Sequence, residues 1–270
     1  MFRFESVAAG YFLLLAIGAA RAPAPLRRAA FGAATAVAAA VLVVVGSRTL
    51  PDDARLWLAH LYLVLGYWIP SVLTAFTGET RFEAWLRRND AAWRSYMRPP
   101  SPVAAGVLEI AYLACYVVVP AAFVTVWTYG TGNQVDRFWV AVLLAGFSCY
   151  VTLPWLVSRP PRMFEEHRIP SLDDARDALS ESRRAPRGVA SFNASILRTA
   201  SHQFNTFPSG HVAVAIAVAL SVLPVWRAAA VIFGVIAAGI AVGAAIGRYH
   251  YGIDVLVGAL VGVAAAMLAG

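Results

Sequence analysis

Long apolar runs, separated by shorter polar connections, dominate the chain. The runs are roughly 17 to 25 residues long, which is the length an α-helix needs to cross a bilayer core of about 30 Å. We expect eight membrane segments, at residues 6–20, 29–46, 54–76, 103–129, 137–157, 210–226, 228–247 and 250–270. The pattern therefore predicts an all-α fold, a polytopic membrane bundle of helices.

Composition agrees with this class and indicates the kind of partner. The chain has 270 residues, of which 60% are hydrophobic and 14% charged, a balance too apolar for an ordinary soluble domain. The net charge is +7, and all 22 basic residues are arginines. A basic membrane protein is expected to contact anionic membrane lipids and not nucleic acid. Nothing in the sequence indicates an oligomeric state.

Three connecting regions are informative. The first apolar run ends in "GAARA", similar to a signal-peptide cleavage site, but the runs that follow favour a retained helix. The stretch "RFEAWLRRNDAAWRSYMRPP" is typical of either a helix lying in the membrane interface or a solvated loop helix. The longest polar connection is residues 158–209, where a functional role is expected. Glycines spaced by four, such as Gly258 and Gly262, predict close helix packing.

The tetrapeptide Pro208-Ser209-Gly210-His211 opens the sixth apolar run. Glycine lets the backbone approach a ligand closely, and the unpaired amides of a helix N-terminus favour phosphate. A histidine on that first turn can donate a proton to an oxygen leaving phosphorus. Taken alone, the motif is more typical of a helix cap with an interfacial histidine.

A second motif, "GRYHYGIDVLVG", precedes the last run. On a helix, His250 and Asp254 would share a face, so the aspartate would accept one imidazole N–H and leave the other nitrogen as a nucleophile. The alternative is an interfacial belt with a capping aspartate. His211 and His250 are separated by one helical hairpin, so both return to the same membrane face, where "SRPPR" also ends the fifth segment. We expect His60 to be a packed or interfacial residue and His167 and His202 to be loop residues near the site.

Together these motifs resemble the type 2 phosphatidic-acid phosphatase superfamily. The resemblance implies a six-helix core, here residues 51–270 with the catalytic-side loop 158–209, and leaves residues 1–50 as an added N-terminal membrane hairpin. It implies that His250 is the nucleophile, that Asp254 orients it, and that His211 is the general acid. Ser209 and the Gly210 amide would hold phosphate oxygens.

The chain departs from the family pattern at two cations. Arg159 fits the first motif, but its lysine position falls on Thr152, and the arginine position of the third motif falls on Ala244. Arg248 lies four residues later, and we expect it on the same helical face, where it would replace the missing cation. The expected phosphate-binding arginines are Arg159, Arg162 and Arg248. The "PPR" ending at Arg162 is more similar to the sphingomyelin and inositol-phosphorylceramide synthase branch.

The resulting hypothesis is an integral-membrane phosphatase that hydrolyses a lipid phosphate or diphosphate through a phosphohistidine. The alternatives are a lipid phosphotransferase with an alcohol acceptor, similar to inositol-phosphorylceramide synthase, and a non-enzymatic transporter or scaffold. No metal or other cofactor is expected, because no carboxylate cluster accompanies the histidines.

The face of the membrane that carries the site is left open by the sequence. The resemblance favours the outer face of the plasma membrane. With the eight expected segments, 17 of the 22 arginines fall in connections on the catalytic side and 5 on the other, which favours the cytoplasmic face.

Overall fold

The computed structural model describes residues 1–75, 80–94, 101–166 and 204–270. Within these residues the chain is helical and has no strand, only an isolated bridge between Ser158 and Asn205. The helices are α1 Arg3–Gly18, α2 Leu26–Thr49, α3 Asp52–Leu73, α4 Arg81–Arg94, α5 Pro102–Leu113, α6 Val118–Tyr129, α7 Gly132–Tyr150, α8 Arg162–Glu166, α11 Gly210–Val222, α12 Arg227–Ile246 and α13 Gly252–Ala269, with short 3₁₀ turns η1 Ala19–Arg21 and η2 Ala114–Tyr116. The all-α prediction is confirmed. His167, His202 and most of the predicted catalytic-side loop lie outside the described residues.

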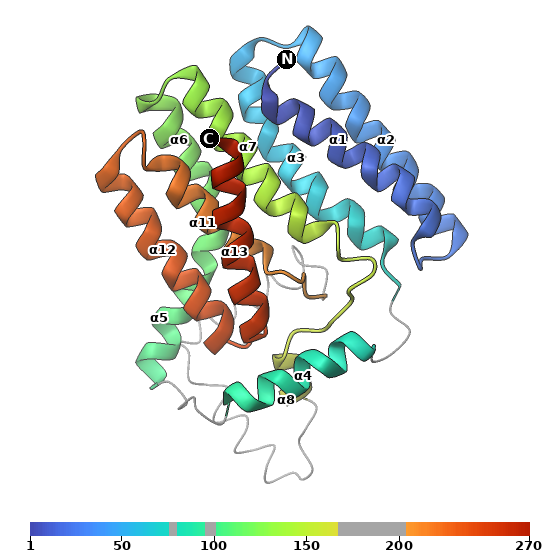
Figure 1. Cartoon of the computed structure of the whole chain (residues 1–270), viewed down its shortest axis with the longest axis vertical. Helices are drawn as coiled ribbons and strands as arrows, with labels where there is room; N and C mark the ends of the chain where they lie inside the picture. The colour runs from blue at the N-terminus through green and yellow to red at the C-terminus, as the bar shows by residue number, and fades with distance from the viewer. Residues whose placement is uncertain (76–79, 95–100, 167–203) are drawn as a thin grey trace.

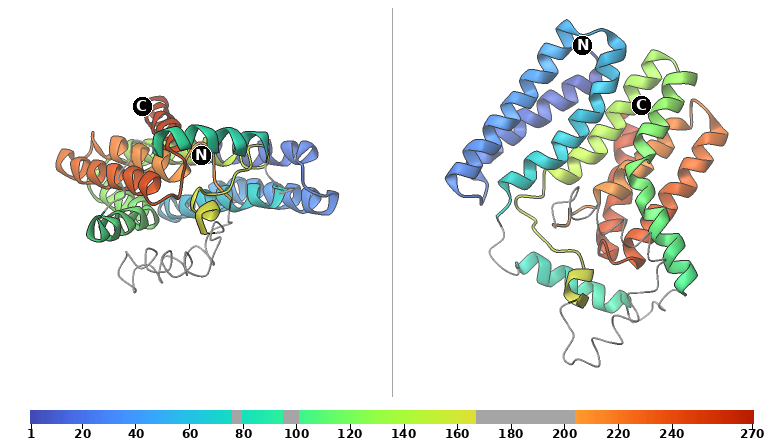
Figure 2. Two further views of the ribbon diagram at one scale, coloured as in Figure 1. Left: turned by 90° about the horizontal axis from the view of Figure 1, so that it is seen from below. Right: turned by 180° about the vertical axis from the view of Figure 1, so that it is seen from behind.

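Helix α7 joins two groups of helices. It packs against α1 and α3 on one side and against α6, α11 and α13 on the other. Figure 1 shows α1, α2 and α3 together on one flank, while α4 and α8 lie across the end of the bundle opposite the start of α1 and the end of α13. The two further views in Figure 2 show the same separation of the flanks. The predicted division at residue 50 stays a prediction.

Membrane-spanning character is clearest at the two ends of the chain. Among the described residues, four helical stretches are long and apolar enough to cross a bilayer, namely α1 with η1, α2, α12 and α13, and the bent pair α5–α6 would be a fifth. Helix α11 has 13 residues, so at 1.5 Å per residue it is only about 20 Å long. The structure is that of a multi-pass membrane protein, and the eight-segment count stays a prediction.

The expected membrane segment 103–129 is not one continuous helix, and its crossing of the membrane as a single segment stays a prediction. The chain forms α5, η2 and α6 instead, with a bend of 55° between the two halves. Pro120 lies in the first turn of α6. Proline has no N–H for the helical ladder and clashes with the carbonyl four residues earlier, so a continuous helix through Tyr116 is disfavoured. The bend puts Cys115 and Tyr116 on the wall of an internal cavity.

Glycines allow α13 to lie directly against the start of α11. A Cβ on Gly258 would come within 2.6 Å of the backbone oxygen of Ser209, and one on Gly262 would meet the backbone oxygen of Ala213. Gly243 on α12 has the same relation to α5, where a Cβ would lie 2.6 Å from the oxygen of Leu108. The predicted role of these glycines in close packing is confirmed.

We expect Gly258→Ala to destabilise the protein by about 1–3 kcal/mol, because the new methyl group meets backbone that cannot rotate away. Gly234→Ala is the matched control, since its Cβ would meet nothing within 4 Å on α12. It should be neutral or slightly stabilising, because alanine is the better helix former. Thermal unfolding of both variants in the same detergent checks this, and equal midpoints would contradict the packing role of Gly258.

Candidate functional site

Two histidines face each other at the end of the bundle near α4. His211 is the second residue of α11, and His250 lies in the short connection between α12 and α13. Their ring centroids are 5.9 Å apart and their planes are inclined by 69°. The structure therefore brings together the two residues that the sequence places 39 positions apart.

Asp254 fixes the geometry on the His250 side. Its carboxylate is fully buried, and Oδ2 lies 3.5 Å from Nδ1 of His250. The same oxygen accepts hydrogen bonds from Nδ2 of Asn205, at 2.5 Å, and from the backbone N–H of Tyr251, at 3.1 Å. The backbone oxygen of Asp254 accepts a bond from the N–H of Ser209. One residue thus connects the turn that carries His250 with the loop that precedes His211.

The expectation that His250 and Asp254 share a helix is wrong in its detail. Helix α13 begins at Gly252, so His250 precedes it and Asp254 lies in its first turn. The pair still meets because the N–H groups of Tyr249 and His250 both donate to the oxygen of Ala244, which folds the connection back on α12. This turn places the side chain of His250 over the first turn of α13, where Asp254 lies.

Burial keeps the imidazole of His250 neutral. Burial, together with the smaller effect of the positive charge of Arg162, lowers the pKa of His250 to about 3. A neutral imidazole retains a lone pair on one nitrogen. Nδ1 lies 3.5 Å from Oδ2 of Asp254, and a proton on Nδ1 would leave that lone pair on Nε2, which suits a nucleophile.

Arg248 does not occupy the predicted helical position. Helix α12 ends at Ile246, and Arg248 adopts a left-handed backbone conformation with φ of 61°. The expectation that it continues the helical face of Ala244 is therefore wrong. Its guanidinium lies 2.7 Å from the carboxylate of Asp90 on α4.

The other two predicted arginines differ in their surroundings. Arg159 pairs with the buried carboxylate of Glu83 through both Nε and a terminal nitrogen, at 3.0 and 2.9 Å. Arg162 places its guanidinium 4.4 Å from the ring centroid of Tyr249, which itself stacks on Tyr112. Of the three predicted arginines, Arg162 is the one that lines the cavity between the histidines.

The loop before α11 is held from both sides. The hydroxyl of Thr152, at the family's lysine position, donates to the backbone oxygen of Phe207. The N–H of Gly210 donates to Oγ1 of Thr206, at 3.3 Å. A Cβ on Gly210 would lie 2.5 Å from the ring of Tyr150, so this position requires glycine. The Ser209 hydroxyl is buried and has no hydrogen-bond partner among the described residues.

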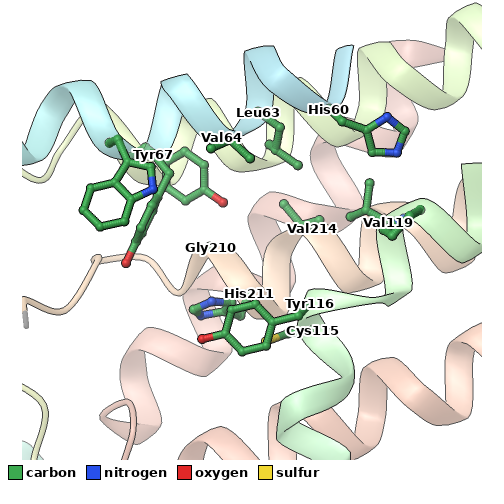
Figure 3. A pocket seen from close by; sticks show the side chains of 13 residues that line it. His60, Leu63, Val64, Tyr67, Cys115, Tyr116, Val119, Gly210, His211 and Val214 are labelled. Atoms are coloured by element: carbon green, nitrogen blue, oxygen red, sulfur yellow. The ribbon is translucent and has the colours of Figure 1, made fainter. Parts of the chain in front are cut away.

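Two cavities meet at His211 and Tyr67. The smaller, of about 30 Å³, is lined by polar groups that include Arg162, Asn205 and His250. The larger, of about 390 Å³, is mainly apolar and is walled by α3, η2, α6 and α11. Figure 3 shows His211 and Tyr116 on one side of this larger cavity and His60 further along it. An apolar chamber therefore ends at the imidazole of His211.

The sequence interpretation missed several residues of this site. Asn205 lies three residues before the "PSGH" motif, and this closeness was the available signal. Tyr249, Glu83 and Asp90 act through contacts between distant segments, for which no short-range pattern exists. Within the described part of the chain, no group of three or more histidine, cysteine or acidic side chains is placed to hold a metal ion.

Comparison with known proteins gives one match. A family model described as the PAP2 superfamily matches residues 80–268. The match includes both histidines, Asp254 and the three predicted arginines, while the α3 side of the larger cavity, with His60 and Tyr67, lies before it. No curated protein and no solved structure matches the chain.

The depressed pKa of His250 predicts a pH-dependent stability. Below the ordinary histidine pKa of 6.5, His250 binds a proton in the unfolded chain. In the folded chain it stays neutral down to about pH 3. The folded state should therefore lose about 1.4 kcal/mol per pH unit as the pH falls through this window. Thermal unfolding of the wild type and of His250→Gln at pH 7.5 and 5.5 checks this. The wild type should lose more stability than the variant, and equal losses would contradict a neutral, buried His250.

Proposed function

The chain belongs to the PAP2 superfamily, and from that premise we propose that it is an integral-membrane phosphatase that hydrolyses a lipid phosphate or diphosphate through a phosphohistidine. Membership supports phosphatase-type chemistry on a lipid phosphate. The observation that carries the finer proposal is the pair of facing imidazoles, 5.9 Å apart, at the junction of a polar and an apolar cavity.

The two cavities suit the two parts of such a substrate. The phosphate belongs in the polar cavity between His250 and Arg162, and the hydrocarbon belongs in the apolar cavity beyond His211. The polar cavity has room for only one or two water molecules, so its side chains must separate for a phosphate to enter. The scissile P–O bond then lies beside His211, where the cavities meet.

In the first step, Nε2 of His250 attacks phosphorus. A new N–P bond forms while the bond from phosphorus to the lipid oxygen breaks, and His211 gives its proton to that oxygen, releasing a lipid alcohol. The carboxylate of Asp254, 3.5 Å from Nδ1 of His250, is the proposed acceptor of the Nδ1–H and would balance the positive charge that develops on the ring.

In the second step, water attacks the phosphohistidine. The neutral His211 takes a proton from the water, an O–P bond forms, the N–P bond breaks, and inorganic phosphate leaves. His250 and His211 thereby return to their starting protonation states. An alcohol in place of water would give a new phosphoester, which is the alternative phosphotransferase reaction.

Phosphoryl transfer depends mainly on positioning and on stabilising charge on the phosphoryl oxygens. Arg162 is the best-placed cation for this purpose, since it lines the polar cavity and is oriented by the ring of Tyr249. The buried hydroxyl of Ser209 and the N-terminal amides of α11 at Gly210 are the proposed neutral donors. Arg159 remains a proposed phosphate ligand, and its guanidinium is paired with Glu83.

We expect purified protein to release inorganic phosphate from a lipid phosphate in detergent without any added alcohol. His250→Ala should lower kcat by about 10⁴-fold or more, because no other group supplies the nucleophile, while leaving the size-exclusion profile unchanged. Phosphate assays with and without a lipid alcohol provide the measurement. Turnover that appears only when the alcohol is present would favour the phosphotransferase, and wild-type turnover in His250→Ala would exclude this residue as the nucleophile.

We also expect turnover to persist in excess chelator, because imidazole and guanidinium groups supply the proposed chemistry. Rates measured after dialysis against chelator, with and without added magnesium, test this. A rate that falls in chelator and recovers with magnesium would replace the metal-independent scheme.

A further inference from the structure

Helix α4 turns an acidic face toward the bundle. Glu83 and Asp90 are seven residues apart, two turns of helix, so they lie on one side of α4 together with Leu86. Leu86 and Glu83 are fully buried, and Asp90 is 7% exposed. Buried carboxylates are costly unless they are paired, so their partners show what this helix holds.

Glu83 holds the segment that follows α7. Its carboxylate accepts the backbone N–H of Arg159, at 2.7 Å, in addition to the guanidinium. The neighbouring Ser158 accepts the N–H of Asn205 through its backbone oxygen, and the side chain of Asn205 donates to Asp254. A continuous set of bonds therefore runs from α4 to the aspartate that orients His250.

Asp90 holds the connection that carries His250 itself. It pairs at 2.7 Å with Arg248, two residues before His250. The backbone of Arg248 is left-handed, a conformation that costs a non-glycine residue free energy and persists only where the surroundings impose it. The N–H of Arg162 also donates to the backbone oxygen of Arg248. The ion pair and this bond fix the unusual turn from two directions.

We propose that α4 is a positioning element for the nucleophile, with Glu83 and Asp90 as its positioning residues. Arg248 then acts through its ion pair with Asp90, fixing the turn that aims Nε2 of His250, and is not a ligand of the phosphate. This inference rests on the proposed function only in taking His250 as the nucleophile. Arg248 would thus position His250, whereas the arginine expected at the position of Ala244 would bind phosphate.

The charge-swapped double variant Asp90→Arg with Arg248→Asp separates the two roles. Aspartate tolerates the left-handed conformation better than most residues, so the swap preserves both the turn and the pair. We expect each single change to lower kcat for phosphate release by on the order of 10²-fold, as a small misplacement of a reacting group does. The double variant should recover to within about tenfold of the wild type. A double variant as inactive as Arg248→Asp alone would overturn the proposal, because a phosphate ligand cannot be replaced by a carboxylate.

Asp90→Asn provides a second measurement with little change in shape. If the ion pair positions His250, kcat falls while the inhibition constant of inorganic phosphate stays the same. If Arg248 is instead a phosphate ligand held back by Asp90, its release should tighten phosphate inhibition, and that result would also overturn the proposal. Arg88→Gln, on the exposed side of α4, is the matched control and should leave both quantities unchanged. A wild type that releases no phosphate, or a fully active His250→Ala, would mean failure of the proposed function and not of the role of α4.

Discussion

A carboxylate excluded from water requires hydrogen-bond donors, and Asp254 obtains them from segments far apart in the sequence. Its side chain takes one bond from Asn205 and one from the backbone of Tyr251, and it faces His250. Its backbone oxygen takes the N–H of Ser209. Both motif-bearing segments are therefore arranged around one buried carboxyl group, and the separation of the two histidines follows from that arrangement.

Close packing of α11 against α13 makes this arrangement possible. Gly258, one turn after Asp254, leaves room for the backbone of Ser209, so the start of α11 approaches the start of α13 directly. Helix α4 then closes the end of the bundle with two further buried carboxylates, each paired with an arginine. The site thus combines an apolar scaffold with two charged pairs on α4, as expected where few water molecules can reach.

The parts of this structure that follow from short-range patterns were predictable from the sequence. The apolar runs predicted the helices, and the spacing of the motifs predicted that His211 and His250 lie at one end of the bundle. Pro120 was a signal of the bend before it, but the continuous apolar run outweighed that signal in the prediction. The left-handed turn at Arg248 and its pairing with Asp90 depend on segments about 160 residues apart, as 248 minus 90 is 158. No local pattern contains such a contact, so the prediction that the helix continues from Ala244 through Arg248 was wrong.

The junction of the two cavities at His211 has a consequence for the direction of the proposed reaction. The apolar cavity is bounded by Val64, Trp68 and Tyr116, side chains that are also partly exposed on the outer surface of the bundle. A lipid alcohol released there would dissolve in the hydrocarbon of the bilayer, whereas inorganic phosphate would dissolve in water. Because the two products partition into different phases, they rarely meet again at the site. The membrane itself would thus act as an extraction solvent that draws the hydrolysis forward.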